Sequence, residues 1–226
     1  FPTRRSSDLA VMETEIRAPY TLRLASTPQQ QATLREFIQN AYRREFNAQI
    51  PHFLPILAGL YRADGILVAA CGLNLARHDH LYLEQYLAQP VEALLNQQSG
   101  ETVRRDSIVE VGNLATHAPG NGRLMFAALC RLLNDNAFDW VVFTGTAKLR
   151  NSFSHLGIAL IELADADASK IGPSAAEWGE YYRCHPKVMA GNLALGRQQL
   201  ASNSLLLHLF GAMPALTAEQ DQRIAS

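Results

Sequence analysis

An acidic residue, a glycine-rich turn and a helix start follow one another within residues 109–124, which makes this stretch the best candidate for chemistry. Glu110 lies in an otherwise apolar strand, where burial disfavours the charged carboxylate and raises its pKa toward neutrality. Such a carboxyl group suits a general base that removes a proton from an attacking amine. A structural ion pair with Arg104 or Arg105 would explain the same residue equally well.

The turn after this strand contains Gly120, Asn121 and Gly122, and Arg123 follows it. The first turn of a helix offers unpaired N–H groups and the positive end of the helix dipole, which together attract anions. Glycine lets the backbone approach a phosphate closely, and Arg123 would add a cation. The same glycines also fit an ordinary tight bend between a strand and a helix, and the spacing alone favours that simpler explanation.

The overall composition excludes several classes of function. The 20 basic and 21 acidic residues leave a net charge of −1, so the chain lacks the basic field that nucleic-acid binding needs. No stretch approaches the roughly 20 apolar residues of a membrane-spanning helix, so we expect no integral membrane segment. The histidines and the three distant cysteines lack metal-ligand spacing, and we expect free thiols, no metal and a cytoplasmic protein.

Hydrophobic periodicity and turn residues predict the elements that position these groups. Asp64-Gly65 between two apolar runs predicts an antiparallel hairpin, and Thr27-Pro28 predicts the start of a helix. Strands are expected at residues 20–25, 56–62, 66–75, 107–115, 139–144 and 158–163, with a last strand formed by residues 178–182 and 187–190. Helices are expected at residues 28–46, 90–96, 123–136, 148–156 and 193–210, while residues 81–86 fit either type.

The second half of the chain alternates strands with helices, which implies locally parallel strands, whereas the hairpin implies antiparallel ones. We therefore expect an α/β fold with a mixed central sheet flanked by helices. Residues 12–192 would form this single domain, and residues 193–226 would form a C-terminal helix and tail. Residues 1–9 read like the translation of a sequencing adapter, and we expect residues 1–11 to be an artefact or disordered.

This layout and the turn at residues 117–122 resemble acyltransferases of the GNAT type. His117-Ala-Pro-Gly120-Asn-Gly122 is similar to their Gln/Arg-x-x-Gly-x-Gly/Ala motif, with a histidine in place of the usual Gln or Arg. The resemblance implies that the turn holds the phosphopantetheine of acyl-CoA or of acyl carrier protein, through His117, Gly120, Asn121, Gly122 and Arg123. A neutral imidazole is a poorer partner for phosphate, so the phosphates of the donor would lie differently or the donor would be acyl carrier protein.

A second resemblance concerns the proton that the departing thiolate takes up. Phe153-Ser-His-Leu-Gly157 is similar to a Tyr-x-x-x-Gly element of the same enzymes, in which the tyrosine can act as the general acid. Phe153 has no hydroxyl, so this role does not carry over. Tyr181 or Tyr182 can substitute if the fold brings either one near.

Three other polar residues are expected in the site. Similar enzymes often have a glutamate on this strand as the base, which favours that role for Glu110. Strand periodicity puts Asn113 on the opposite face, where it can hydrogen-bond the amides of the acyl chain or cap the end of the strand. Asn151 follows the strand that ends at Thr144, and open α/β sheets tend to bind ligands at the carboxyl ends of their strands.

From about residue 42 to residue 191 the sequence resembles the bacterial thermostable hemolysin family. The matching runs are Arg43-Arg-Glu-Phe46, Pro51-His-Phe-Leu-Pro55, Asp64-Gly65, Ala69-Ala-Cys-Gly-Leu73, Ile108-Val-Glu-Val-Gly-Asn-Leu-Ala115, Trp140-Val-Val-Phe-Thr144, Leu149-Arg-Asn-Ser-Phe153, Trp178-Gly179, Tyr181-Tyr182 and Val188-Met-Ala-Gly191. The family name implies lysis of red cells, yet the sequence reads as a compact α/β domain without the long apolar helices of a pore. An enzyme that makes a lytic acylated amphiphile would give the same phenotype.

Together these patterns predict an N-acyltransferase that moves an acyl group from acyl-CoA or acyl carrier protein to a small-molecule amine. Glu110 would be the base, with Asn113 and Tyr182 beside it, and acyl carrier protein would be a partner if it is the donor. Two alternatives stay open. One is a membrane-lytic protein that needs no acyl donor. The other, weaker one is a GNAT-like binding domain without catalysis, which the missing hydroxyl at Phe153 leaves open.

Overall fold

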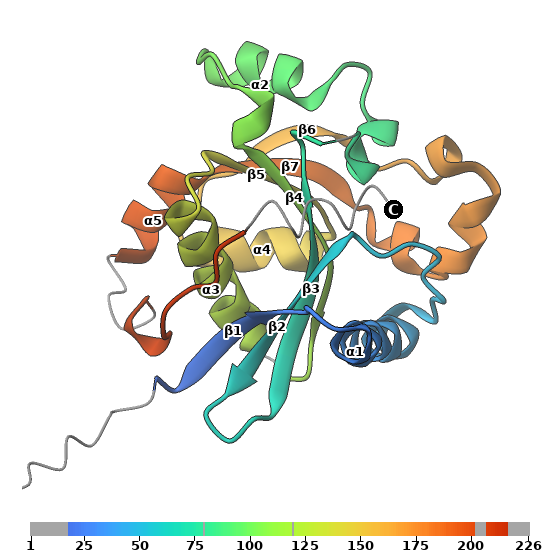
Figure 1. Ribbon diagram of the computed structural model, residues 1–226. Helices are drawn as coiled ribbons and strands as arrows, with labels where there is room; N and C mark the ends of the chain where they lie inside the picture. Colours follow the sequence, from blue (N-terminus) through green and yellow to red (C-terminus); the bar gives the residue numbers. More distant parts are fainter. Residues whose placement is uncertain (1–17, 79, 119, 202–206, 217–226) are drawn as a thin grey trace, which may run out of the picture.

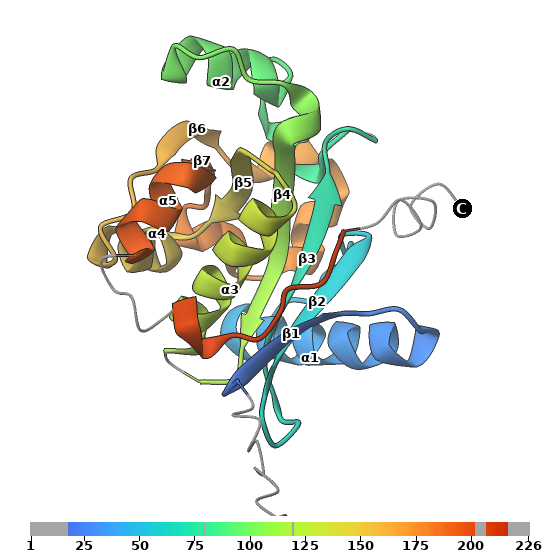
Figure 2. The same ribbon diagram turned by 60° about the vertical axis from the view of Figure 1, so that its left-hand side comes forward.

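The computed structural model describes residues 18–78, 80–118, 120–201 and 207–216, so residues 1–11 lie outside the described part. Within it, one mixed sheet of seven strands has helices on both faces, as Figures 1 and 2 show, and the expected α/β fold is confirmed. The strands are β1 (Tyr20–Leu24), β2 (Ile56–Arg62), β3 (Leu67–Leu75), β4 (Ile108–Thr116), β5 (Trp140–Gly145), β6 (Ile161–Asp165) and β7 (Lys187–Asn192), in the spatial order β1-β2-β3-β4-β5-β7-β6.

Helices of both kinds connect the strands. The α-helices are α1 (Pro28–Phe46), α2 (Val91–Ser99), α3 (Asn121–Asp135), α4 (Ala147–His155) and α5 (Leu193–Ala201). Short 3₁₀ segments lie at Tyr82–Tyr86, Arg105–Ser107, Ala168–Trp178, Tyr181–Cys184 and Leu207–Leu209. Helix α1 covers one face of the sheet, while α3 covers the opposite face together with α4 and α5 (Figures 1 and 2).

Helix α1 forms because its start carries both halves of a capping box. The Gln30 backbone N–H donates to the Thr27 hydroxyl at 3.2 Å, and the Thr27 N–H donates to the Gln30 side chain at the same distance. Its buried stripe, which contains Leu34, Ile38 and Tyr42, packs on the sheet with the helical spacing that the sequence predicts. The helix therefore ends beside β4, close to the predicted site.

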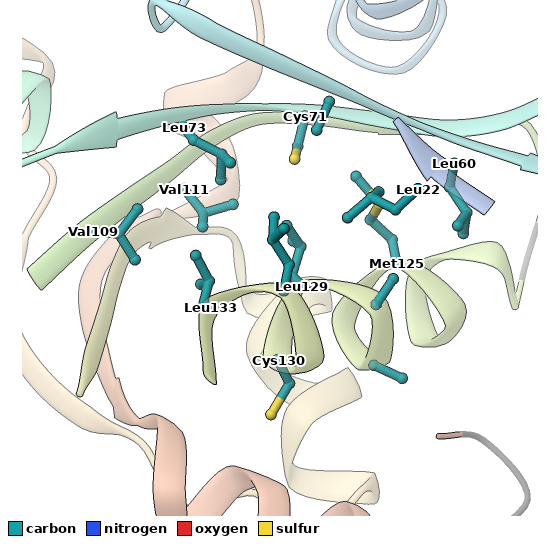
Figure 3. Packing of buried hydrophobic residues seen from close by; sticks show 14 of the residues in the cluster. Leu22, Leu60, Cys71, Leu73, Val109, Val111, Met125, Leu129, Cys130 and Leu133 are labelled. Atoms are coloured by element: carbon teal, nitrogen blue, oxygen red, sulfur yellow. The ribbon is translucent and has the colours of Figure 1, made fainter. Parts of the chain in front are cut away.

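The core on the other face fixes helix α3. Leu129 and Leu133 point from α3 toward Leu73 and Val111 of the strands, whereas Cys130 points away from the sheet (Figure 3). Each buried leucine contributes roughly 2 kcal/mol of hydrophobic stabilisation. This packing holds the first turn of α3 at the end of β4, where the glycine-rich turn lies.

Some expectations about the second half are wrong. Of the described strand pairs, only β4–β5 is parallel, because β7 enters antiparallel between β5 and β6. Residues 178–182 lie in 3₁₀ segments rather than in a strand. The helix expected at residues 193–210 is shorter: α5 ends at Ala201, and residues 202–206 lie outside the described part.

Candidate functional site

Asn113 lies on the same face of β4 as Glu110, which corrects the expectation from strand periodicity. The reason is a β-bulge, in which the single residue Cys71 of β3 lies opposite both Asn113 and Leu114 of β4. Asn113 has a left-handed backbone, with a φ of 51°, as the first residue of such a bulge often does. The extra residue shifts the alternation of side chains by one, so the later part of β4 is out of phase with the earlier part.

The buried Asn113 side chain binds the segment of residues 51–55 to the sheet. Its Oδ1 accepts from the Leu54 N–H at 2.8 Å, and its Nδ2 donates to the His52 carbonyl at 3.0 Å. Leu54 also lies close over two glycines, since a Cβ at Gly72 or Gly112 would come within 2.7 or 2.9 Å of its side chain. Asn113 therefore has structural partners already and forms a fixed wall of the site.

Strands β4 and β5 separate beside the bulge. Their parallel pairing stops at Val111 and Phe143, while β4 continues to Thr116 and β5 continues to Gly145. Backbone groups of β4 beyond Val111 that face β5 therefore have no strand partner there. A gap of this kind between two strands of one sheet gives a ligand direct access to main-chain N–H and C=O groups.

A cavity of about 870 Å³ passes through this gap. Its mouth includes the turn before α3, and its interior is lined mostly by apolar side chains of α3, α4, α5 and the strands. Representative interior residues are Phe126, Leu129, Cys130, Leu133, Val141, Phe143, Leu149, Phe153, Ile158, Leu160 and Leu200. A chamber of this volume and lining is suited to a long apolar chain.

A second cavity of about 40 Å³ lies on the Glu110 side of the sheet. The two cavities share part of their lining, namely Tyr42, Val111, Gly112, Asn113, Thr144 and Tyr181. Aromatic side chains surround the smaller one, which is also lined by His52, Leu54, Tyr82, Tyr86 and Trp178. The two cavities therefore adjoin at the bulge, with a buried carboxyl group on one side and a deep apolar chamber on the other.

Glu110 is 3% exposed, and burial raises its pKa to about 7 although hydrogen bonds oppose the shift. Its two carboxylate oxygens accept the backbone N–H groups of Tyr82 at 2.8 Å and Leu83 at 3.0 Å. A carboxyl group that titrates near neutrality can take up a proton at physiological pH, as a general base must. The same two bonds also cap the 3₁₀ segment Tyr82–Tyr86, so Glu110 has a structural role whether or not it is catalytic.

The ion pair that sequence reasoning weighed for Glu110 is absent from the described residues. Arg105 instead binds Glu84 and Glu92, each at 2.7 Å, and Arg104 pairs with Asp106. The Arg105 guanidinium and two backbone N–H groups hold the pKa of Glu84 down to about 2 against the opposing effect of burial. Arginine neighbours therefore do not neutralise Glu110, and its carboxyl group keeps its raised pKa.

The predicted donor-binding turn lies at the mouth of the larger cavity. His117, Gly120, Gly122 and Arg123 line it, and both His117 and Arg123 are exposed. Asn121 does not line this cavity, because its Nδ2 donates to the Val68 carbonyl at 3.2 Å and holds the turn against β3. Four of the five turn residues expected to hold phosphopantetheine are thus on one side of the opening.

Two other expected residues lie outside the cavities. Asn151 is exposed on α4 and lines neither cavity. The Tyr182 hydroxyl lies 2.6 Å from the Tyr86 hydroxyl, and burial raises the pKa of Tyr182 to about 12. Only Tyr86 of this pair lines the smaller cavity, so Tyr182 is connected to the site only through its hydrogen bond with Tyr86.

Sequence reasoning named Tyr181 only as an alternative, although it lines both cavities. It is buried, its hydroxyl donates to the Thr144 carbonyl at 3.4 Å, and burial raises its pKa well above the usual value. Trp178 and His52 were missed because neither belongs to a catalytic motif. The only local signal was the unusual density of aromatic residues in Trp178-Gly-Glu-Tyr-Tyr182.

Phe153, which occupies the position where the resemblance to GNAT enzymes led us to expect a tyrosine, packs inside the larger cavity. Its ring stacks on Phe126 with 4.2 Å between ring centroids and lies 5.2 Å from the ring of Phe143. The three rings make an apolar wall next to α4. This position therefore serves to line the chamber in this chain.

The described residues contain no group of three His, Cys, Asp or Glu side chains that could hold a metal ion. Within the same ranges, every helix is too short or too polar to cross a membrane.

Comparison with known proteins identifies both a sequence family and a fold. The sequence profile described as thermostable hemolysin matches residues 24–197. No curated protein sequence matches the chain significantly. Among solved structures, FeeM, an N-acyl amino acid synthase from uncultured soil microbes, is 17% identical with a TM-score of 0.57, covering 81% of this chain and 96% of FeeM.

Two other solved structures have the same fold. BjaI, a CoA-dependent acyl-homoserine lactone synthase solved with SAM and isopentyl-CoA, is 10% identical with a TM-score of 0.53, covering 92% of this chain and 100% of BjaI. The AHL synthase LasI is 10% identical with a TM-score of 0.50, covering 78% of this chain and 91% of LasI. Identities this low establish a shared GNAT-like fold and leave the activity of this chain to be argued from its own site.

Proposed function

The chain belongs to the thermostable hemolysin family, and from that premise we propose that it is an N-acyltransferase. The proposed reaction moves an acyl group from acyl-CoA or acyl carrier protein to a small-molecule amine. The observation that carries this proposal is the meeting of two cavities at the β4 bulge, one deep and apolar and the other containing Glu110. The solved structures with the same fold include synthases described as CoA-dependent, which supports an acyl thioester as the donor.

The donor is proposed to enter at the turn before α3. The N-terminus of this helix and the exposed Arg123 favour an anionic group such as the phosphate of phosphopantetheine. The pantetheine arm would then follow the gap between β4 and β5, where main-chain groups can pair with its amides. The acyl chain would occupy the apolar chamber, which leaves the thioester carbonyl near the bulge.

The chemistry is a nucleophilic substitution at the thioester carbonyl. The amine nitrogen forms a bond to the carbonyl carbon while Glu110 accepts the amine proton, and the carbon–sulfur bond then breaks. Backbone N–H groups of β4 beyond Val111 are proposed to stabilise the oxyanion. The Tyr181 hydroxyl stays protonated because its pKa is raised, so it can hydrogen-bond the departing thiolate.

This proposal also gives a reason for the family name. A long acyl chain joined to a polar amine is an amphiphile, and amphiphiles insert into membrane surfaces in proportion to their buried methylene groups. Lysis would then be caused by the product and would not require the enzyme itself to cross a membrane. The cysteines Cys71, Cys130 and Cys184 are all free, which fits a reducing compartment and the proposed cytoplasmic location.

The test is thioester turnover by purified protein that lacks residues 1–9. Acyl-CoAs and acyl-loaded carrier protein of several chain lengths are offered with a mixture of amines, and free thiol is read over time. Thiol release that requires both protein and amine supports the proposal and identifies the donor. Binding of donors without turnover would instead indicate a non-catalytic domain, which the structural hydrogen bonds of Glu110 favour as the second candidate.

The length of the acyl chain is expected to depend on Gly196 of α5. Gly196 lines the larger cavity, and a Cβ there would have the Cys130 sulfur as its nearest neighbour at 3.9 Å, so a side chain fits without a clash but fills space. In Gly196→Leu, each methylene that loses its place in the cavity costs about 0.8 kcal/mol, or roughly fourfold in kcat/KM. The ratio of long-chain to short-chain kcat/KM should therefore fall at least about tenfold.

Ala194→Leu is the matched control, because Ala194 is exposed on the same helix and does not line the cavity. It adds the same side chain to α5 without filling the chamber. An unchanged chain-length profile in Gly196→Leu, or the same change in both variants, would show that the chain does not extend toward α5.

A further inference from the structure

The smaller cavity is lined by aromatic rings around one carboxyl group. Trp178 and Tyr181 have ring centroids 5.4 Å apart, and Tyr82 stacks on His52 at 4.7 Å. Together with Tyr42 and Tyr86 these rings surround the cavity that Glu110 lines. Aromatic faces carry negative charge density and attract ammonium groups, most strongly where water is excluded.

No cation among the described residues faces this cavity. Arginine and lysine are absent from its lining. His52 is its one basic side chain, and partial burial of the ring lowers its pKa, so most of the imidazole is neutral near pH 7. Nearby cations are engaged elsewhere: Arg44 donates to the Thr116 carbonyl, and Lys148 binds Glu45 at 2.7 Å. A carboxylate placed here would be buried without a counter-ion and beside another acid, which is strongly unfavourable.

The cavity is also small. A volume of about 40 Å³ has room for about three non-hydrogen atoms, because one water needs roughly 10–15 Å³ by this kind of measure. The end of an unbranched aminoalkyl group, one nitrogen and two carbons, has that size. The branched centre of an α-amino acid, with its carboxylate next to the amine, needs more room than this cavity alone provides.

One polar atom of the cavity lining is unsatisfied. The buried Trp178 indole N–H has no acceptor with good hydrogen-bond geometry, and it lies near the Tyr82 hydroxyl, whose pKa burial raises and this N–H partly lowers. A buried donor without an acceptor is costly, and such donors are often completed by a ligand or water. An uncharged oxygen of the acceptor, or the carbonyl of the thioester, would supply the missing partner.

We propose that the smaller cavity binds the acyl acceptor and that this acceptor is a small primary amine without a carboxylate, such as an amino alcohol or an alkylamine. The inference rests on the proposed N-acyltransferase function and names the substrate class for the amine side. The ammonium enters among the aromatic rings and transfers one proton to Glu110, and its nitrogen then forms the bond to the thioester carbon. The carbon–sulfur bond breaks, and the departing thiolate takes up the second proton from nitrogen to leave as free thiol.

The test compares 2-aminoethanol with glycine, two small amines that differ in carrying a hydroxymethyl group or a carboxylate. Binding is read first, without any acyl donor, from the fluorescence of Trp178 in a Trp140→Phe background, since these are the two tryptophans of the chain. 2-Aminoethanol should bind at least about tenfold more tightly than glycine. Turnover is then read as thiol release with each amine and the same acyl donor.

A gain-of-function variant makes the test sharper. His52 lines the rim of the cavity and is exposed overall, so His52→Arg would place a cation there that can still stack on Tyr82. This variant should bind glycine more tightly than the unaltered protein does, and the preference for 2-aminoethanol should shrink severalfold. His52→Gln, which adds no charge, is the matched control and should leave the preference intact.

The outcomes separate this inference from the proposed function. Tighter binding of 2-aminoethanol without thiol release would support the inference and count against N-acyl transfer. Thiol release that is faster with glycine would support N-acyl transfer and overturn the inference. Equal binding of both amines, or binding of neither, would also overturn it, because the aromatic enclosure would then not select an acceptor.

Discussion

Glu110→Gln is expected to lower kcat/KM for amine-dependent thiol release by roughly 100- to 10,000-fold, the range typical of a lost general base. Gln keeps the shape of the side chain but cannot accept the proton. In the unaltered enzyme only the deprotonated carboxylate is active, so kcat/KM, corrected for protonation of the free amine, should rise with pH through about 7 and then level off. The residual activity of the variant should lack this rise.

The structural role of Glu110 requires its own control. In the variant, an amide NH₂ group replaces one of the oxygens that accept from Tyr82 and Leu83, which costs about 1–2 kcal/mol of stability. Activity is therefore compared far below the unfolding midpoint, and donor binding is measured in parallel. A variant that keeps more than a tenth of the activity, with the pH dependence intact, would restrict Glu110 to capping the 3₁₀ segment.

Gly179→Ala is expected to destabilise the protein by about 3 kcal/mol or more, which corresponds to roughly 6–12 °C in Tm for a chain of this size. Gly179 has φ 54° and ψ −124°, and a Cβ there would lie 2.3 Å from the Phe46 carbonyl oxygen. Backbone atoms cannot move aside easily, because Glu180 N–H donates to the same oxygen at 2.7 Å. Thermal unfolding followed by circular dichroism measures the loss.

Gly172→Ala is the control that separates the steric contact with Phe46 at position 179 from the strain of a positive φ, which both positions share. Gly172 also has a positive φ, 61° with ψ −140°, but a Cβ there would have no atom within 4 Å. Its cost should be limited to about 1–2 kcal/mol of conformational strain. If both variants lose the same stability, the close approach of residues 178–181 to the end of α1 does not contribute, and the positions of Trp178 and Tyr181 must be fixed by other contacts.

Local signals predicted much of the fold. The start of α1 at Thr27-Pro28, the Asp64-Gly65 hairpin and the junction of β4 with α3 each depend on residues close together in sequence, and all three are present. The glycine-rich turn could be predicted for the same reason. The order of the last strands could not, because β7 enters between β5 and β6 after a long 3₁₀ connection whose path no local pattern specifies.

The parts of the site that sequence reasoning missed depend on contacts between distant segments. The face of Asn113 depends on the bulge, which in turn depends on Leu54, 59 residues away in sequence, and on its contact with two glycines of β3 and β4. The choice between Tyr181 and Tyr182 depends on how residues 178–181 pack on Phe46. The residue type and the apolar residues on either side were sufficient to propose Glu110 as a candidate base, whereas the residues around it in space could be named only from the three-dimensional arrangement.

The bulge also limits how β4 can change during evolution. Before the bulge, Val109 and Val111 face α3, and after it Leu114 does. The alternation of side chains is therefore shifted by one residue between the two parts of the strand. Substitutions within β4 alter one side chain at a time and leave the bulge and the alternation of faces intact. A one-residue deletion between Gly112 and Ala115 would remove the bulge: Ala115 could keep its pairing with Ala70, but Asn113 would be lost or would turn to the face of α3. Natural variants of this chain should therefore differ in composition along β4 while an insertion or deletion there is selected against.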